Sequence, residues 1–216
     1  MQPTEDLTVK AFALGTWMTN CYVISTPNKK CWIIDAGFDP DELINYIQNQ
    51  ELQPEKIILT HAHLDHIAGL DHVHQTFPGV PIYIHETEKD FLTDTTLNLS
   101  AGVGIPIIAP EADHFLEHGQ QLTLGSYNFE IRHTPGHSPG GICLYQKENN
   151  FVIAGDTLFE NSIGRYDFPT SDGRTLYESI INQLYTLPDN TAVFPGHGNP
   201  TVIGHEKQNN PFVRPA

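Results

Sequence analysis

Short apolar runs alternate with turns rich in Gly, Pro and Asp along the whole chain. Apolar runs of about four to eight residues with β-branched or aromatic side chains are typical of strands. We therefore expect strands at residues 7–14, 21–25, 31–35, 56–59, 81–85, 121–124, 127–132, 142–146, 151–153 and 192–194.

Helical spacing of the apolar positions appears between these runs. A helix is predicted at residues 40–50, with Asp39 as its N-cap, and another around residues 176–184. A further helix should follow residue 66, and the residues that share its buried face are Ile67, Leu70, Val73 and His74. Strands interrupted by single helices predict an α/β protein with two sheets covered by helices on their outer faces.

Length and composition indicate one domain spanning residues 1–216. The chain is long enough for a substantial core, and no repeat, low-complexity tract or Pro/Ser-rich linker divides it. Cys21, Cys31 and Cys143 each lie in an apolar run, so we expect buried, inert thiols. A reactive thiol or a disulfide between Cys21 and Cys31 is the alternative.

The charge excludes some partners. The formal net charge is −15, from 26 acidic and 11 basic residues, and no basic cluster exceeds the pair Lys29 and Lys30. Nucleic-acid binders usually carry a basic face, so we expect no nucleic-acid partner. Residues 1–7 have neither a basic start nor a long apolar stretch, which predicts no signal peptide, no membrane span and a cytoplasmic location.

Residues 60–69, Thr-His-Ala-His-Leu-Asp-His-Ile-Ala-Gly, are the strongest chemical signal in the chain. They place His61, His63, Asp65 and His66 within six positions, directly after a predicted strand. Imidazole nitrogen and carboxylate oxygen are ligands that Zn²⁺ prefers. Side chains two apart in an extended segment point the same way, so the first two histidines can bind one ion together. The alternatives are an exposed loop with chance histidines, or a structural zinc site.

Three further candidate ligands follow predicted strands farther along the chain. His137 lies in Thr-Pro-Gly-His-Ser-Pro-Gly-Gly, Asp156 in Ala-Gly-Asp-Thr, and His197 in Pro-Gly-His-Gly. Each lies in a loop that contains glycine, where the backbone can turn and approach an ion closely. The recurrence of this pattern favours a metal site over chance.

The order of these motifs resembles the metallo-β-lactamase superfamily over residues 12–197. Within it, Gly155-Asp-Thr-Leu-Phe and Ser162-Ile-Gly-Arg-Tyr-Asp-Phe-Pro are most similar to the single-domain form of the glyoxalase II group, the hydroxyacylglutathione hydrolases. The resemblance implies a four-layer αββα sandwich. Within this superfamily, the lack of a basic cluster argues against a nucleic-acid-cleaving member, and the N-terminal residues argue against a secreted antibiotic-degrading lactamase.

The resemblance also assigns roles to residues of this chain. His61, His63 and His137 would bind one ion, Asp65, His66 and His197 a second ion, and Asp156 would bridge them. The cofactors would be two divalent metal ions, most often zinc, with iron or manganese as options. A hydroxide bridging the two ions would attack a small acyl thioester such as S-lactoylglutathione, and Asp65 would orient the hydroxide or move a proton.

Substrate recognition has weaker signals. The resemblance places Arg165 where the group carries a basic residue that contacts glutathione, but Asp167 replaces the aromatic residue expected two positions later. An ion pair of Arg165 with Asp167 or Asp172 is the structural alternative. Only 19 residues follow His197, so we expect no C-terminal helical glutathione-binding domain.

Two other functions are considered. A mononuclear iron persulfide dioxygenase shares the segment Gly164-Arg-Tyr-Asp-Phe and would use fewer of the ligands. A non-catalytic metal-binding scaffold of the same fold would not require all seven ligands. The other seven histidines are predicted to be structural or surface residues, with His114 and His118 placed in an acidic loop.

Overall fold

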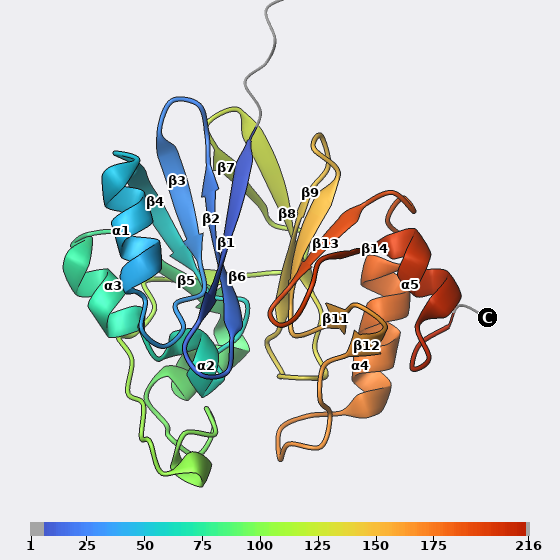
Figure 1. The fold of residues 1–216 in the computed structure, drawn as a ribbon. Coiled ribbons are helices and arrows are strands. Elements are labelled where there is room, and N and C mark those ends of the chain that lie inside the picture. Colours follow the sequence, from blue (N-terminus) through green and yellow to red (C-terminus); the bar gives the residue numbers. More distant parts are fainter. Residues whose placement is uncertain (1–6, 215–216) are drawn as a thin grey trace, which may run out of the picture.

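Two six-stranded sheets form the centre of the molecule in a computed structural model that describes residues 7–214 (Figure 1). Residues 1–6, on which the expectation of no export signal largely rests, lie outside the described part. No helix within residues 7–214 combines the length and apolarity needed to cross a membrane.

The first sheet has the order β1-β2-β3-β4-β5-β6. Its strands are β1 (Thr8–Leu14), β2 (Thr19–Ser25), β3 (Lys30–Ile34), β4 (Gln53–Ile58), β5 (Ile82–His85) and β6 (His114–Leu116). The first three strands pair antiparallel, and β3 to β6 pair parallel. The parallel half therefore places the carboxyl ends of β3, β4 and β5 at one edge.

The second sheet has the order β14-β13-β10-β9-β8-β7. Its strands are β7 (Gln121–Leu124), β8 (Tyr127–His133), β9 (Ile142–Gln146), β10 (Phe151–Gly155), β13 (Ala192–Pro195) and β14 (Thr201–Val202). Only β10 and β13 pair parallel, so their carboxyl ends lie together. A two-stranded ribbon of β11 (Leu158–Phe159) and β12 (Ser162–Ile163) lies beside them.

Helices cover the outer face of each sheet, as Figure 1 shows. The helix α1 (Asp41–Asn49) and α3 (Leu70–Thr76) lie on the first sheet, and α4 (Gly173–Ser179) and α5 (Ile203–Asn209) on the second. The short α2 (Leu64–Ile67) lies at the edge where the sheets meet, and α4 continues into a π-helical turn, η3 (Ile180–Leu184). Two 3₁₀ segments, η1 (Glu86–Leu92) and η2 (Ala101–Val103), complete the described elements.

The alternating direction of side chains along the central strands explains how the sheets and helices pack in layers. In β3, Trp32 and Ile34 pack between the two sheets, whereas Cys31 and Ile33 pack against the helices of the first sheet. Side chains of a strand alternate between its faces, so a strand covered on both sides is apolar at every position. The predicted αββα sandwich is confirmed.

The predicted strands agree with the structure to within a few residues, but three local expectations are wrong. Asp39 has a left-handed φ of +53°, and Pro40 occupies the N-cap position of α1 without a side-chain cap bond. The helix after residue 66 is two helices, α2 and α3, that break at Gly69. A Cβ there would lie 2.2 Å from the carbonyl oxygen of Gly37, which requires glycine at the break. His114 belongs to strand β6, with its ring 4.6 Å from that of Tyr83, rather than to a loop.

Strands β6, β11, β12 and β14 and helix α5 were not predicted. The strands among them have only two or three residues, and α5 has seven, so each is too short for its pattern to repeat enough to be recognised. The three cysteines are buried and free, as expected, and no disulfide forms between Cys21 and Cys31.

Candidate metal centre

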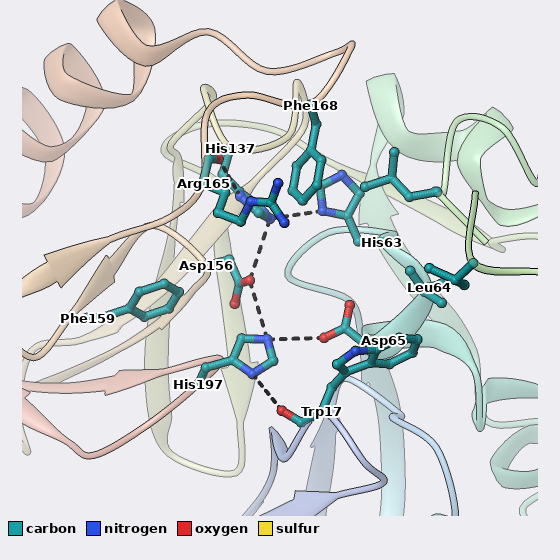
Figure 2. Close-up of a pocket in the computed structure, with 12 residues that line it drawn as sticks. Trp17, His63, Leu64, Asp65, His137, Asp156, Phe159, Arg165, Phe168 and His197 are labelled. Carbon is teal, nitrogen blue, oxygen red and sulfur yellow. Dashed lines mark hydrogen bonds and ion pairs between the residues drawn. The ribbon is translucent and has the colours of Figure 1, made fainter. Parts of the chain in front are cut away.

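Seven side chains predicted from the sequence converge at the edge where the carboxyl ends of β4, β10 and β13 meet, and Figure 2 draws all of them except His61 and His66. Four come from the segment after β4, one from the β8–β9 loop, one from the turn after β10 and one from the loop after β13. They are His61, His63, Asp65, His66, His137, Asp156 and His197. The residues are far apart in sequence, and the two sheets bring them together.

One group consists of His61, His63 and His137, whose candidate ligand atoms lie within 4.8 Å of one another. The Nδ1 of His63 is 2.9 Å from the Nε2 of His137. The Nδ1–H of His137 donates to the carbonyl oxygen of Arg165 at 2.8 Å, which leaves a lone pair on its Nε2 facing the group. These three nitrogens therefore suit one cation.

A second group consists of Asp65, His66 and His197. The Oδ2 of Asp65 is 3.1 Å from the Nε2 of His197 and 3.6 Å from the Nε2 of His66. The Nδ1 of His197 contacts the carbonyl oxygen of Trp17 at 3.2 Å, so its Nε2 is turned toward the carboxylate. The donor set is one oxygen and two nitrogens, again suited to a divalent metal.

Asp156 lies between the two groups, as Figure 2 shows. Its Oδ2 is 3.5 Å from the Nε2 of both His137 and His197, and its Oδ1 is 3.3 Å from the Nε2 of His66. The carboxylate therefore reaches residues of both groups at once.

Unpartnered buried atoms provide the test of fit for a metal. Among residues 7–214, seven buried side-chain nitrogen and oxygen atoms have no hydrogen-bond partner, and four of the seven belong to this cluster. They are the Nε2 atoms of His61, His63 and His66 and the Oδ1 of Asp156. Each buried polar atom without a partner costs about 1–3 kcal/mol. A cation would supply the missing partner of the Nε2 atoms of His61 and His66 and of the Oδ1 of Asp156, so the cluster fits divalent metal ions.

The electrostatics favour the metal-binding forms of the first group. Burial lowers the pKa of His63 to about 3 and also lowers the pKa of His61 and His137, so all three rings are neutral at pH 7. Burial opposes ionisation of Asp156, but the neighbouring histidines lower its pKa below the ordinary value. Neutral imidazoles and an ionised carboxylate are the states that bind a cation.

In the second group, neighbouring charges outweigh the effect of burial on the pKa of the histidine His66. Burial acts to lower the pKa of His66, but the carboxylates of Asp65, Asp156 and Asp35 outweigh it and raise that pKa. Burial acts against ionisation of Asp65, while His66, His197 and the hydroxyl of Thr19 lower the pKa of that carboxyl. A cation at this group would replace the proton that the carboxylates otherwise attract.

A cavity of about 390 Å³ opens over the cluster. Apart from cluster residues it is lined by Trp17, Leu64, Leu99, Val103, Phe159, Arg165 and Phe168. The Arg165 side chain lies over the ring of Phe168 at 4.3 Å and forms a two-bond ion pair with Asp167, with both N···O distances 3.0 Å. The predicted ion pair with Asp167 is thus present, and Arg165 also borders the cavity, as expected of a substrate-contacting residue.

Comparison with known proteins identifies the family. The model of the metallo-β-lactamase superfamily matches residues 14–197. The chain belongs to the metallo-β-lactamase superfamily. Its similarity to a "Probable metallo-hydrolase YqgX" of Bacillus subtilis is 40% identity, over 93% of this chain and 94% of that protein. Its similarity to the "Hydroxyacylglutathione hydrolase GloC" of Haemophilus influenzae is 36% identity, over 96% and 98% of the two chains.

Solved structures of the superfamily agree with the fold. The BLEG-1 B3 metallo-beta-lactamase superposes with a TM-score of 0.91 and 41% identity, covering 95% of this chain and 99% of that one. TTHA1623, solved in a di-iron-bound form, superposes with a TM-score of 0.84 and 35% identity, covering 95% and 100%. The sandwich and the placement of its loops are thus those of metallo-β-lactamase proteins.

Asp35 is a positioning residue of this superfamily member that the sequence reasoning missed. It lies directly after β3 and is buried, and its carboxylate accepts the backbone N–H and the hydroxyl of Thr60, both at 2.7 Å. It also accepts the Nδ1–H of His66 at 2.8 Å, which turns the Nε2 of that ring toward the cluster. An acidic residue directly after an apolar run, as at Asp156, was the signal available in the sequence.

Glu88 is a second missed residue and joins the two loops that carry the first group. It is fully buried on η1, and its carboxylate accepts the backbone N–H of Ala62 at 3.0 Å, that of Gly140 at 2.8 Å, and the hydroxyl of Ser138. Burial raises the pKa of Glu88, although these donors act to lower it. No local pattern around residue 88 points to this role.

Glycine is required at one position beside the cluster. A Cβ on Gly196 would lie 2.1 Å from the Oδ1 of Asp156 and 2.9 Å from the Cε1 of His66. Any side chain there would displace one of these groups. Glycine therefore permits the close approach of this loop to Asp156 and His66, while its approach to an ion stays a prediction.

Proposed function

We propose that this protein is a hydrolase that uses two divalent metal ions to cleave small acyl thioesters, S-lactoylglutathione among them. The convergence of unpartnered, buried His and Asp atoms on the floor of an open cavity carries the proposal. No hydrogen bond within the protein offsets the cost of burying these atoms, whereas a metal-dependent active site uses such atoms as ligands.

The proposed ligands are those predicted from the sequence. His61, His63 and His137 would hold one ion, Asp65, His66 and His197 the other, with Asp156 shared between them. When bound, two such ions would activate water at neutral pH and polarise the substrate carbonyl. A thiolate is a good leaving group, so a thioester needs little further assistance.

The protein's own side chains would orient the reactants. Asp65 is held ionised and hydrogen-bonded by the hydroxyl of Thr19 at 2.7 Å, so it can accept a hydrogen bond from the attacking water and fix its direction. Arg165 lies at the opposite rim, where its guanidinium can donate to a substrate carboxylate. Leu64 and Phe168 line the cavity and limit the access of bulk water.

The hydroxyacylglutathione hydrolase activity named for the Haemophilus influenzae relative supports the thioester class. The di-iron form of TTHA1623 supports two ions and admits iron beside zinc. A mononuclear iron dioxygenase, which would use fewer ligands, is less favoured because Asp65 and His197 join the cluster as closely as the other members do.

The test is metal content measured together with thioester turnover. After purification with excess zinc or iron, we expect about two ions per chain and hydrolysis of S-lactoylglutathione. Asp156→Ala and His61→Ala should abolish turnover while the protein stays folded, and Asp71→Ala, on the exposed side of α3, should leave turnover unchanged. One iron per chain with turnover of glutathione persulfide would replace the proposal by the dioxygenase. Full activity of either ligand variant would refute the ligand assignment.

Hydrolysis of β-lactams is a second candidate. The structural agreement with the BLEG-1 B3 metallo-beta-lactamase favours it, because the fold and the size of the chain match almost completely. A chromogenic cephalosporin assayed beside the thioester distinguishes the two. We expect thioester turnover to exceed cephalosporin turnover, and the reverse ranking would favour the β-lactam.

A further inference from the structure

The cavity over the metal centre has two unlike sides. Beside His197 lie two aromatic residues, Phe159, with its ring 6.2 Å from the imidazole, and Trp17, whose carbonyl oxygen contacts the Nδ1 of the same histidine. Figure 2 shows both side chains flanking His197, with Leu64 farther along the same wall. No Lys or Arg lines this side among the described residues.

The other side combines an aromatic ring with a charge. Phe168 lies 5.3 Å from His63 and 5.7 Å from His137, and Arg165 covers its ring. Of the described residues that line the cavity, Arg165 is the only Lys or Arg. The Nε edge of its guanidinium is bound by Asp167, which lines a neighbouring hollow rather than this cavity. The Nη1 group therefore stays free to bind a ligand.

The apolar side is partly exposed to solvent. Trp17, between β1 and β2, is 39% exposed, and Val103, at the end of η2, is 49% exposed, and both line the cavity. Exposed apolar side chains that gather around a cavity with a few polar groups are typical of ligand sites, where the ligand covers them. Their position beside a catalytic cluster indicates which part of the substrate they contact.

We propose that the preferred substrates are thioesters with an apolar acyl group, which packs against Trp17 and Phe159 beside His197 and against Val103, which lines the same cavity. The thiol part then extends across the cluster toward Arg165, which can bind a carboxylate of that part. This inference rests on the proposed thioester hydrolysis and names the substrate class within it.

The charge balance supports an apolar rather than an acidic acyl group. Asp167 already compensates Arg165, and the chain carries a formal charge of −15. An acidic acyl group beside Trp17 and Phe159 would meet no Lys or Arg of the described cavity lining and would lie in a negative field. An apolar acyl group has no such penalty and gains from each methylene that leaves water.

The experiment uses the metal-loaded protein and a series of thioesters of 3-mercaptopropionate, with acetyl, butyryl and hexanoyl groups. We expect kcat/KM to rise about two- to fourfold for each added methylene until the acyl group fills the cavity. Trp17→Ser and, independently, Val103→Ser should flatten this dependence. The control Phe115→Ser changes an exposed aromatic residue on β6, outside the cavity, and should retain the slope.

Four results would count against the inference. A kcat/KM independent of acyl length, with every thioester hydrolysed, overturns the inference and leaves the proposed function standing. If kcat/KM rises with acyl length as steeply in Trp17→Ser and Val103→Ser as in the Phe115→Ser control, the acyl group lies elsewhere. Hydrolysis of S-lactoylglutathione but of none of these thioesters overturns the inference alone, whereas hydrolysis of neither overturns the proposed function and the inference with it.

Discussion

The hydrogen bond from His66 to Asp35 leads to a prediction about metal affinity. The carboxylate of Asp35 accepts three donors, two of which belong to Thr60 and one to His66. In Asp35→Asn the amide oxygen must face the backbone N–H of Thr60, because that donor cannot change. The amide nitrogen then faces the Nδ1 of His66 and donates to it.

This reversal changes the tautomer of His66. With its Nδ1 accepting a hydrogen bond, the ring carries its proton on Nε2, the atom that faces Asp65 and Asp156. A protonated Nε2 has no lone pair for a cation. Loss of a hydrogen-bonding partner behind a ligand typically lowers metal affinity about 10- to 100-fold, equivalent to about 1.4–2.7 kcal/mol.

The assay is a competition titration with a chromogenic chelator that resolves the affinities of the two ions. We expect Asp35→Asn to lower the affinity for one ion by this factor. The affinity for the ion proposed to bind His61, His63 and His137 should change little. Thr191→Val is the control, because it removes a buried hydroxyl bond at the opposite end of β13 and costs only about 1 kcal/mol of stability. Two ions bound by Asp35→Asn with wild-type affinity would refute the tautomer argument.

Three further predictions concern Gly196, Glu88 and His85. Gly196→Ala places a methyl group against Asp156 and should reduce metal content at equal fold, measured by elemental analysis and circular dichroism; unchanged metal content would contradict the steric argument. Glu88→Ala leaves three buried donors unpaired and should lower the free energy of unfolding by about 3 kcal/mol in urea titrations. A loss of less than about 1 kcal/mol would show that water replaces the carboxylate. Burial and the stacked ring of His133 lower the pKa of His85 to about 4, below the usual value of ~6.5 in the unfolded chain. Between these two values the unfolded state binds more protons than the folded state. The free energy of unfolding should therefore fall as the pH drops from about 6.5 toward 4. His85→Phe should remove about 1 kcal/mol of the loss between pH 7 and pH 5, after a discount for solvent screening, in urea titrations at the two pH values. A loss equal to that of the wild type would refute this reasoning.

Local sequence determined the strands and the identity of the candidate ligands. The bounds of β7 and β9 coincide with the predicted runs, because alternation and apolarity are properties of a few consecutive residues. The density of His and Asp in residues 60–69 singled out the chemistry for the same reason. That these side chains bind two metal ions stays a prediction, but their convergence in space is present in the structure.

Tertiary structure decided what supports the cluster and what surrounds it. Asp35 reaches Thr60 and His66 only because β3 and β4 pair parallel, which brings residues 25 and 31 positions apart into contact. Glu88 joins loops 26 and 52 positions away, and no local pattern records such distances. Local sequence specifies the conformation and chemistry of each segment, whereas the packing of two sheets specifies which segments meet. The candidate ligands were therefore recognisable in the sequence, while their supporting hydrogen bonds and the apolar lining of the cavity depend on the assembled sandwich.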